Sequence, residues 1–413
     1  MIDPATSVEQ RVVAAILARI RSRRAAVSSI REKVQVASTD RLRPARIRDA
    51  QFSDFDAVGK LKEKWGLIPD PFENWQRMWR QNPALTPEAA ERPIGWILEA
   101  DDRVVGYLGN IPLPYLYGGR PLRVVAGHCF VVEPPYRGTG LSLMAAFFRQ
   151  SSVDLFITTT AVESVGKIAR AYKSDPLPQP DYETVLFWVL RSRPFAQCIA
   201  ENLSSRPSVS WIGKSLVSVA VGVDRIIRRR RPQESSRRLS VREIAVSEIG
   251  DDFQGLWIEI LNERPRLLAD RSPAVLRWHF QTPHERGTTR VLCCYASGKL
   301  LGYLVIRSES AQTAGIQRSL IADALVKHDD PEILQALLAA AYDHAKQAGS
   351  HVLEVLGFPK SIRQICLKWN PYQRKYPSCP FLYKAVDPIL RETLSDPAAW
   401  YATPFDGDTT LWP

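Results

Sequence analysis

Residues 131–142 read Val-Val-Glu-Pro-Pro-Tyr-Arg-Gly-Thr-Gly-Leu-Ser, and this stretch decides the predicted fold. An apolar strand runs into a Pro-Pro break, and a turn with glycines at 138 and 140 then opens a helix with an apolar face. Glycine lacks a Cβ atom, so consecutive backbone N–H groups can point at one anion. The N-terminus of the following helix also favours negative charge. The stretch therefore predicts a cradle for a pyrophosphate group.

Two better-known phosphate-binding motifs do not fit the same residues. No Gly-Lys-Ser/Thr follows, as a Walker A loop requires, and the third glycine of a Rossmann fingerprint is missing. An ordinary glycine turn that starts a core helix is the alternative interpretation.

Strands and helices are predicted on both sides of this loop. The apolar runs 96–100 and 104–108 flank two aspartates, which predicts a hairpin, and a strand over 122–132 follows. A helix over 140–150 and a strand over 155–160 come after the loop. A hairpin followed by strand, helix and strand is typical of a mixed α/β layer architecture.

Three segments of the chain recur once, in the same order and at nearly the same spacing. The matching pairs are 47–55 with 241–249, 78–83 with 277–283, and 100–108 with 296–304. Ordered repetition of this kind indicates a duplicated structural unit. The second copy predicts strands over 290–295, 300–307, 319–326 and 352–356 and a helix over 331–348.

The second copy has lost the glycine turn. Residues 321–332 align with the cradle, contain no glycine, and place Asp329, Asp330 and Glu332 where a pyrophosphate would dock. Like charges at that position oppose binding of an anion. We therefore expect the second copy to be a structural or substrate-binding partner and not a second catalytic centre.

The run from Arg137 to Ser142 resembles the cofactor signature of the GNAT superfamily of acyl-CoA N-acyltransferases, Arg/Gln-x-x-Gly-x-Gly/Ala. Ser142 departs from that pattern as a small residue at the last position. The hairpin and the strand that begins at Ile47 also lie where this family has them. The resemblance covers 44–195 and, through the repeat, 239–385.

The resemblance implies an α/β fold of two tandem GNAT-like domains, each a mixed, mostly antiparallel sheet flanked by helices. The predicted plan is a basic amphipathic N-terminal helix (1–43), a GNAT-like domain with the acyl-CoA loop (44–195), a linker with an apolar helix and an Arg run (196–238), a degenerate GNAT-like domain (239–385) and a C-terminal tail (386–413).

The resemblance also implies a co-substrate, acetyl-CoA or another acyl-CoA. Val131 and Val132 would lie along its pantetheine arm, and the strand over 156–160 would part from theirs to leave room for the thioester. Backbone amides would hold the pyrophosphate at Arg137, Gly138, Thr139, Gly140, Leu141 and Ser142.

Three residues are candidates for proton transfer. Tyr172 lies near the place where the family has a general acid, although residues 161–164 lack the family's Asn. Glu133 and His128 are candidates for the base that takes the ammonium proton of the acceptor. The alternatives are that Tyr172 only packs in the core, that Glu133 is a solvated carboxylate in a loop, and that His128 is a sheet residue whose hydrogen bonds are made within the protein.

The positive charge is concentrated in two segments. The chain has 55 Lys+Arg and 44 Asp+Glu, a net charge of +11, of which residues 1–48 carry +7 and residues 225–238 carry +6, leaving −2 for the remainder. Apolar and basic positions over 7–35 and 211–231 predict basic amphipathic helices. They suggest peripheral contact with an anionic membrane through 1–40 and 211–231, or simple packing on the domains. Nucleic acid is not expected, because no stacking aromatics interleave with the arginines.

The sequence lacks the features of secreted, membrane-spanning and metal-binding proteins. No stretch reads as a signal peptide or a transmembrane helix, and neither the six cysteines nor the six histidines have ligand spacing. We expect a cytoplasmic protein, peripheral at the inner membrane face if its basic helices bind lipid, with no metal.

The predicted function is an acyl-CoA-dependent N-acyltransferase, acetyl being the expected acyl group and a primary amine the acceptor. By analogy, the acceptor would be a small molecule or saccharide, such as an amino sugar or precursor in surface-polysaccharide assembly. An aminoacyl-tRNA-dependent cell-wall peptide transferase of similar tandem fold and a non-catalytic CoA-binding protein are the alternatives.

Overall fold

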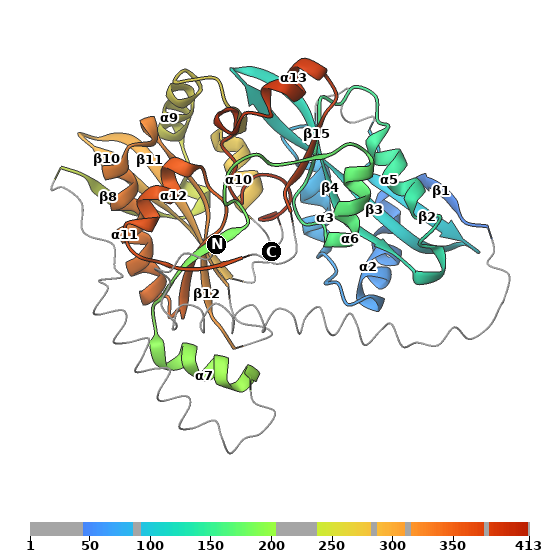
Figure 1. The fold of residues 1–413 in the computed structure, drawn as a ribbon, viewed down its shortest axis with the longest axis horizontal. Coiled ribbons are helices and arrows are strands. Elements are labelled where there is room, and N and C mark those ends of the chain that lie inside the picture. The colour runs from blue at the N-terminus through green and yellow to red at the C-terminus, as the bar shows by residue number, and fades with distance from the viewer. Residues whose placement is uncertain are drawn as a thin grey trace, which may run out of the picture. The chain divides into compact units, whose positions relative to one another are not determined.

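The computed structural model describes residues 44–85, 92–203, 238–281, 287–309, 315–375 and 380–411. These residues form two compact units (Figure 1). The first unit takes its described residues from Ser38–Gln179, Ile249–Glu285 and Ser378–Pro413, and the second from Pro180–Glu248 and Arg286–Pro377. The predicted basic helices over 1–43 and 211–231 lie outside the described residues.

An eight-stranded mixed sheet forms the centre of the first unit, in the order β1-β2-β3-β4-β5-β15-β6, with β9 paired to β3. The pair β4–β5 is parallel and the other pairs in this sheet are antiparallel. The strands are β1 (Arg46–Asp49), β2 (Gly95–Ala100), β3 (Arg103–Tyr117), β4 (Arg120–Val132), β5 (Leu155–Thr158), β6 (Asp175–Pro176), β9 (Leu267–Ala269) and β15 (Leu382–Ala385).

Helices cover both faces of this sheet. On one face α5 (Leu141–Phe148) and α6 (Glu163–Ala171) bury a core that includes Trp96, Phe147 and Phe156. On the other, α2 (Phe55–Lys64) and α3 (Phe72–Arg80) pack on β3, with Trp75 against Tyr107. The unit also contains α9 (Asp251–Leu261), α10 (Pro273–Phe280) and α13 (Pro388–Thr393). Each large buried side chain contributes roughly 1.5–3 kcal/mol of hydrophobic stabilisation.

A seven-stranded sheet forms the second unit, in the order β14-β7-β13-β12-β11-β10-β8. Its strands are β7 (Thr184–Val189), β8 (Ser240–Ile244), β10 (Gly287–Ala296), β11 (Lys299–Glu309), β12 (Arg318–Val326), β13 (Val352–Val355) and β14 (Tyr372–Lys375). Only β12–β13 is parallel among these described pairs. Figure 1 shows α11 (Pro331–Gln347) and α12 (Lys360–Leu367) beside this sheet, and α7 spans Ser192–Leu203.

The two halves of the chain repeat one order of elements, which confirms the predicted fold class. Strands β1 and β8 each lead into a short 3-10 turn, Phe52–Asp54 and Val246–Glu248, and then into a helix. The hairpins β2–β3 and β10–β11 follow, and then the strand–helix–strand units β4-α5-β5 and β12-α11-β13. Each sheet is mixed and mostly antiparallel.

Strand β3 is much longer than the predicted run over 104–108. It continues to Tyr117 through Pro112 and Pro114, which pair opposite Val125 and Arg123 of β4. Proline is rare in a central strand because it lacks an N–H, so it predicts the end of a strand. Here the carbonyl of Pro114 instead accepts from the backbone N–H of Asp270, just after β9.

The units also differ from the sequence domains, because each takes a strand from the other half of the chain. Strand β7 lies between β14 and β13, and β15 lies between β5 and β6. Antiparallel pairing along their full lengths holds both strands in these positions. The segment expected as a tail is buried in the first unit, where Tyr401, Asp408 and Leu411 are at most 1% exposed.

Candidate functional site

The glycine turn connects β4 to α5 in the first unit. After a 3-10 turn at Pro134–Tyr136, the chain exposes Arg137, Gly138 and Thr139 before α5 begins. The N–H groups of Gly140 and Ser142 donate to the carbonyls of Tyr136 and Thr139, at 2.8 Å and 2.9 Å. The N–H groups of Gly138 and Thr139 have no hydrogen-bond acceptor among the described residues. These two amides at a helix N-terminus can therefore bind an anion.

The two glycines of this turn have different surroundings. A Cβ atom at Gly140 would lie 2.9 Å from Val132 Cγ2, whereas a Cβ atom at Gly138 would have nothing within 4 Å. Neither glycine has a positive φ. Gly140 therefore allows the start of α5 to approach β4 closely, while Gly138 faces open space. This distinction refines the prediction that both glycines serve the anion directly.

Strands β4 and β5 part beside this turn. They pair only from Val124 to Ala126, and β5 ends at Thr158 while β4 continues to Val132. Beyond Ala126 the edge of β4 that faces β5 has no strand partner in the described part of the chain, although β3 pairs with its other edge as far as Val132. The backbone of Val131 and Val132 is thus available to an extended ligand that lies along it.

A bulge interrupts β4 where the strands part. The register with β3 shifts between Tyr107 and Gly109, and Cys129 has a φ of 53°. Val125 and Phe130 both pack in the core beneath α5, so side-chain alternation changes phase between them. The bulge therefore turns two consecutive side chains, those of His128 and Cys129, toward the face that carries α2.

His128 is joined to the C-terminal segment. Its Nδ1 lies 3.0 Å from Oδ2 of Asp408, and the same carboxylate accepts from the hydroxyls of Thr159 (2.7 Å) and Thr160 (2.9 Å) just after β5. Burial lowers the pKa of His128, but the neighbouring Cys129 and Asp408 outweigh it and raise that pKa to about 10. The imidazole is therefore protonated at neutral pH.

A second buried ion pair lies on the same face. Lys62 Nζ of α2 is 2.5 Å from Asp70 Oδ2, and both side chains are 1% exposed. Burial lowers the pKa of Lys62, and its contacts with Cys129 and Asp70 raise it by more, so its net shift is upward. The side chain of Cys129 contributes to raising the pKa of both Lys62 and His128. The bulge thus brings together groups that are far apart in the sequence.

Comparison with known proteins identifies the fold. No protein-family model and no curated protein matches the chain. The structure of a GCN5-related N-acetyltransferase from Anabaena variabilis is similar to this chain, with 11% sequence identity and a TM-score of 0.53. The match covers 83% of this chain and 73% of the other. The N-myristoyltransferase of Saccharomyces cerevisiae with bound myristoyl-CoA is 12% identical with a TM-score of 0.51, covering 86% and 82%. The fold is that of the GNAT acyltransferases.

The GNAT fold predicted from the sequence is thus confirmed, and the structure also locates the remaining candidate residues. Glu133 follows β4, and its Oε1 lies 2.5 Å from Lys64 Nζ. The ring of Tyr172, at the end of α6, stacks on Phe148 with centroids 5.1 Å apart. Phe148 is the last residue of α5, so Tyr172 lies at the opposite end of that helix from the glycine turn. The contacts of Tyr172 favour the packing alternative over the acid.

The equivalent turn of the second GNAT-like unit is closed. The side chain of Asp330 accepts from the N–H groups of Glu332 (2.8 Å) and Ile333 (3.3 Å) at the start of α11. His328 and Asp329 adopt positive φ values of 58° and 50°. The chain's own carboxylate therefore occupies the helix N-terminus where an anion would bind.

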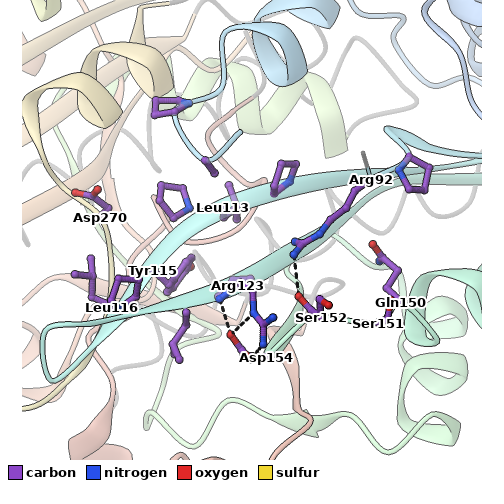
Figure 2. A pocket seen from close by; sticks show the side chains of 18 of the residues that line it. Arg92, Leu113, Tyr115, Leu116, Arg123, Gln150, Ser151, Ser152, Asp154 and Asp270 are labelled. Carbon is purple, nitrogen blue, oxygen red and sulfur yellow. Dashed lines mark hydrogen bonds and ion pairs between the residues drawn. The ribbon is translucent and has the colours of Figure 1, made fainter. Parts of the chain in front are cut away.

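A cavity of about 1120 Å³ lies in the first unit, but not at the glycine turn (Figure 2). Its lining includes Arg149 and Gln150, just beyond the C-terminal end of α5. Arg123 is paired with Asp154 at 2.7 Å. Arg92 donates to the carbonyl of Ser152 at 2.8 Å. This cavity therefore opens at the far end of α5 from the candidate site.

Neither metal sites nor membrane spans are found in the described part of the chain. No group of three or more His, Cys, Asp or Glu could hold a metal ion there. No helix among those residues combines the length and apolar character needed to cross a membrane.

Proposed function

We propose that this chain is an acyl-CoA-dependent N-acyltransferase whose catalytic site lies in the first unit. The observation that carries the proposal is the combination of parted strands β4 and β5 with the uncapped start of α5. The second unit has the same fold but a self-capped helix, which supports one CoA site per chain.

In this proposal the pyrophosphate of CoA binds the amides of Gly138 and Thr139, and the side chain of Arg137 is exposed beside them. The amides of Gly140, Leu141 and Ser142 already donate within the turn, so they position the loop. The pantetheine arm lies along the backbone of Val131 and Val132. This path brings the thioester of an acyl-CoA toward the bulge at Cys129.

The reaction needs proton transfer and stabilisation of an oxyanion. The neutral amine attacks the acyl carbonyl, the C–S bond breaks, and the thiolate of CoA takes up a proton. His128 is protonated and held by Asp408, so we propose it as the proton donor to that thiolate and not as the base. Glu133 forms an ion pair with Lys64. We propose Glu133 as the base that takes the ammonium proton of the acceptor.

The acceptor is proposed to be a primary amine, and an amino sugar or another surface-polysaccharide precursor is the specific candidate. The positive charge of the two basic segments is the feature that supports peripheral contact with an anionic membrane. Co-sedimentation with anionic liposomes tests this contact, and it should weaken when residues 1–40 are deleted or Arg228–Arg231 are neutralised. Equal sedimentation of all forms would contradict it.

Thiol release from acetyl-CoA with a panel of amines tests the activity. We expect amine-dependent release that falls by about 10–100-fold in Asp408→Asn, because His128 then loses the carboxylate that keeps it protonated. Asp330→Asn, in the second unit, is the matched control and should retain activity. Binding of acetyl-CoA without turnover of any amine would favour the non-catalytic alternative.

A further inference from the structure

The cavity of about 1120 Å³ in the first unit has an apolar wall that is already fixed in place. Strand β3 supplies Pro112 and Pro114 to this wall, and β4 supplies Pro121. The carbonyl of Pro112 accepts from Nδ2 of Asn82 at 2.8 Å, and the carbonyl of Pro114 accepts from the N–H of Asp270. Because proline also has a fixed φ, an apolar group can pack on this wall with little loss of conformational freedom.

Three arginines from separate segments of the chain line the same cavity (Figure 2). Asp154 neutralises Arg123, accepting from its Nε at 3.1 Å and its Nη2 at 2.7 Å. Arg92 donates to the carbonyl of Ser152 at 2.8 Å and has no other hydrogen bond among the described residues. The exposed Arg149 has no ion pair within the described ranges, and neither has Arg92. Two guanidinium groups of this cavity therefore remain for an anion.

The surroundings of Arg92 favour an added negative charge. Partial burial lowers the pKa of Arg92, the nearby Arg123 lowers it further, and the attraction of Asp154 does not compensate. The segment that carries Arg92 is held nonetheless, because Nδ2 of Asn110 donates to the carbonyl of Pro93 at 3.0 Å. Two neighbouring cations in a partly desolvated position are typical of a site that binds an anion.

The turn after α5 adds uncharged donors to the same lining. Ser152 has a φ of 58°, and the backbone N–H groups of Ser151 and Ser152 have no acceptor among the described residues. Consecutive backbone N–H groups in a turn can bind one anion together. With the guanidinium groups of Arg92 and Arg149 they offer donors for three or more oxygens. A phosphate has that number, whereas a carboxylate has two.

We propose that this cavity binds an organic phosphate ester with an apolar body. The phosphate lies between Arg92, Arg149 and the turn at Ser151 and Ser152, and the apolar body packs on the prolines of β3 and β4. Helix α5 has eight residues, so about 12 Å separate this site from the glycine turn at its other end. The site is therefore distinct from the proposed catalytic site and does not depend on the proposed function.

Titration calorimetry of the full chain with naphthyl phosphate tests this site. We expect one equivalent to bind, and inorganic phosphate and naphthol to bind at least about tenfold more weakly, because each has only one of the two parts that the site contacts. A short-chain phosphatidic acid is the second probe. Tighter binding of this probe than of naphthyl phosphate would support the same site and identify a lipid as the source of the phosphate.

Substitutions locate the binding. Arg92→Gln and Arg149→Gln should each weaken the binding of naphthyl phosphate by about tenfold, through loss of charge-assisted hydrogen bonds. Arg149 has no partner to lose, so its variant keeps the test valid if Arg92→Gln folds poorly. Arg120→Gln, at an exposed arginine of β4 outside the cavity, is the matched control and should bind as the wild type does. Leu116→Asn, in the apolar lining, should weaken naphthyl phosphate but not inorganic phosphate.

The glycine turn is the other candidate anion site, and Gly138→Glu separates the two. This variant should retain the binding of naphthyl phosphate, because its substitution lies at the opposite end of α5. Loss of binding in Gly138→Glu with full binding in Arg92→Gln and Arg149→Gln would place the probe at the glycine turn and overturn the inference. Failure of the wild type to bind either phosphate probe would also overturn it, and binding of acetyl-CoA by that same chain would leave the proposed function intact.

Discussion

Gly138 and Gly140 lie two residues apart, yet the structure gives them different tasks. Gly140 touches Val132 of the neighbouring strand, and Gly138 faces open space beside the free amides. A motif with two glycines therefore combines a packing requirement with a binding requirement. Substitution separates the two, because a methyl group at each position meets a different environment.

Gly140→Ala should destabilise the first unit by about 1–3 kcal/mol, since its Cβ would overlap Val132 and force β4 or α5 to shift. Gly138→Ala should change the free energy of unfolding by less than about 0.5 kcal/mol, because nothing lies near its Cβ. Urea denaturation of the two variants measures this difference. Equal losses of stability would contradict the assigned packing role.

The raised pKa of His128 makes stability depend on pH. Its ordinary value is 6.5 and its value in the folded chain is about 10, so the native state binds the proton more tightly. Its contribution is complete below a pH of about 6.5 and is lost as the pH rises toward about 10. Wild type should therefore lose stability over this interval more steeply than His128→Asn. Identical pH profiles in urea denaturation would show that His128 is not held as the cation.

At the scale of elements, α5 and α11 are equivalent helices that begin differently. No side chain caps α5, whose N-terminus follows the exposed glycine turn. The carboxylate of Asp330 caps α11. The first N–H groups of α5 donate to carbonyls of the glycine turn, whereas the amides of Gly138 and Thr139 just before the helix have no acceptor within the described ranges. In α11 the carboxylate of Asp330 accepts from the N–H groups of Glu332 and Ile333. This difference explains why the proposal places one CoA site in the chain despite the repeated fold.

Substitution of Asp330 tests whether its carboxylate caps the N-terminus of α11. Asp330→Ala should cost about 1 kcal/mol of stability, because the N–H groups of Glu332 and Ile333 lose their acceptor. Asp330→Asn should retain most of that stability, since an asparagine side chain caps nearly as well. Thermal unfolding of both variants measures the effect. No difference between the alanine and asparagine variants would contradict the capping role.

At the scale of the whole molecule, the two units share the chain by exchanging strands. Strand β7 comes before residues 204–237 in the sequence and lies in the sheet of the second unit. Strand β15 comes after them and lies in the sheet of the first. Each sheet therefore contains strands from both sides of the 204–237 segment. Neither half of the sequence can complete its own sheet.

Cleavage of the chain at a protease site introduced within 204–237 should not separate the halves. The two fragments should co-elute in gel filtration and part only in denaturant, because β7 pairs with β13 and β15 pairs with β5 across the cut. Each half expressed alone should be poorly folded. Fragments that separate in native buffer would contradict this account.

Local patterns allowed much of the fold to be predicted from the sequence. The two hairpins, the glycine turn and the helices after β4 and β12 each depend on neighbouring residues. The extension of β3 was missed because Pro112 and Pro114 normally end a strand. The exchange of β7 and β15 was missed because it depends on pairing between distant segments.

The candidate site was predicted only in part. The loop could be found because its six residues are contiguous, and His128 because it lies on the adjoining strand. Its partner Asp408 is 280 residues away, and no pattern in the sequence links the two. The placement of His128 and Cys129 on the same face of the sheet depends on a bulge that reverses the expected alternation of side chains, and a single sequence carries no signal for it.

The central claim is that the glycine turn of the first unit binds acyl-CoA, and titration calorimetry with acetyl-CoA tests it most directly. We expect the wild-type chain to bind one equivalent. Gly138→Glu should remain folded, because its side chain enters open space, and should lose at least about tenfold in affinity through repulsion of the pyrophosphate. Absence of binding by the wild type, or equal affinity in Gly138→Glu, would contradict the claim.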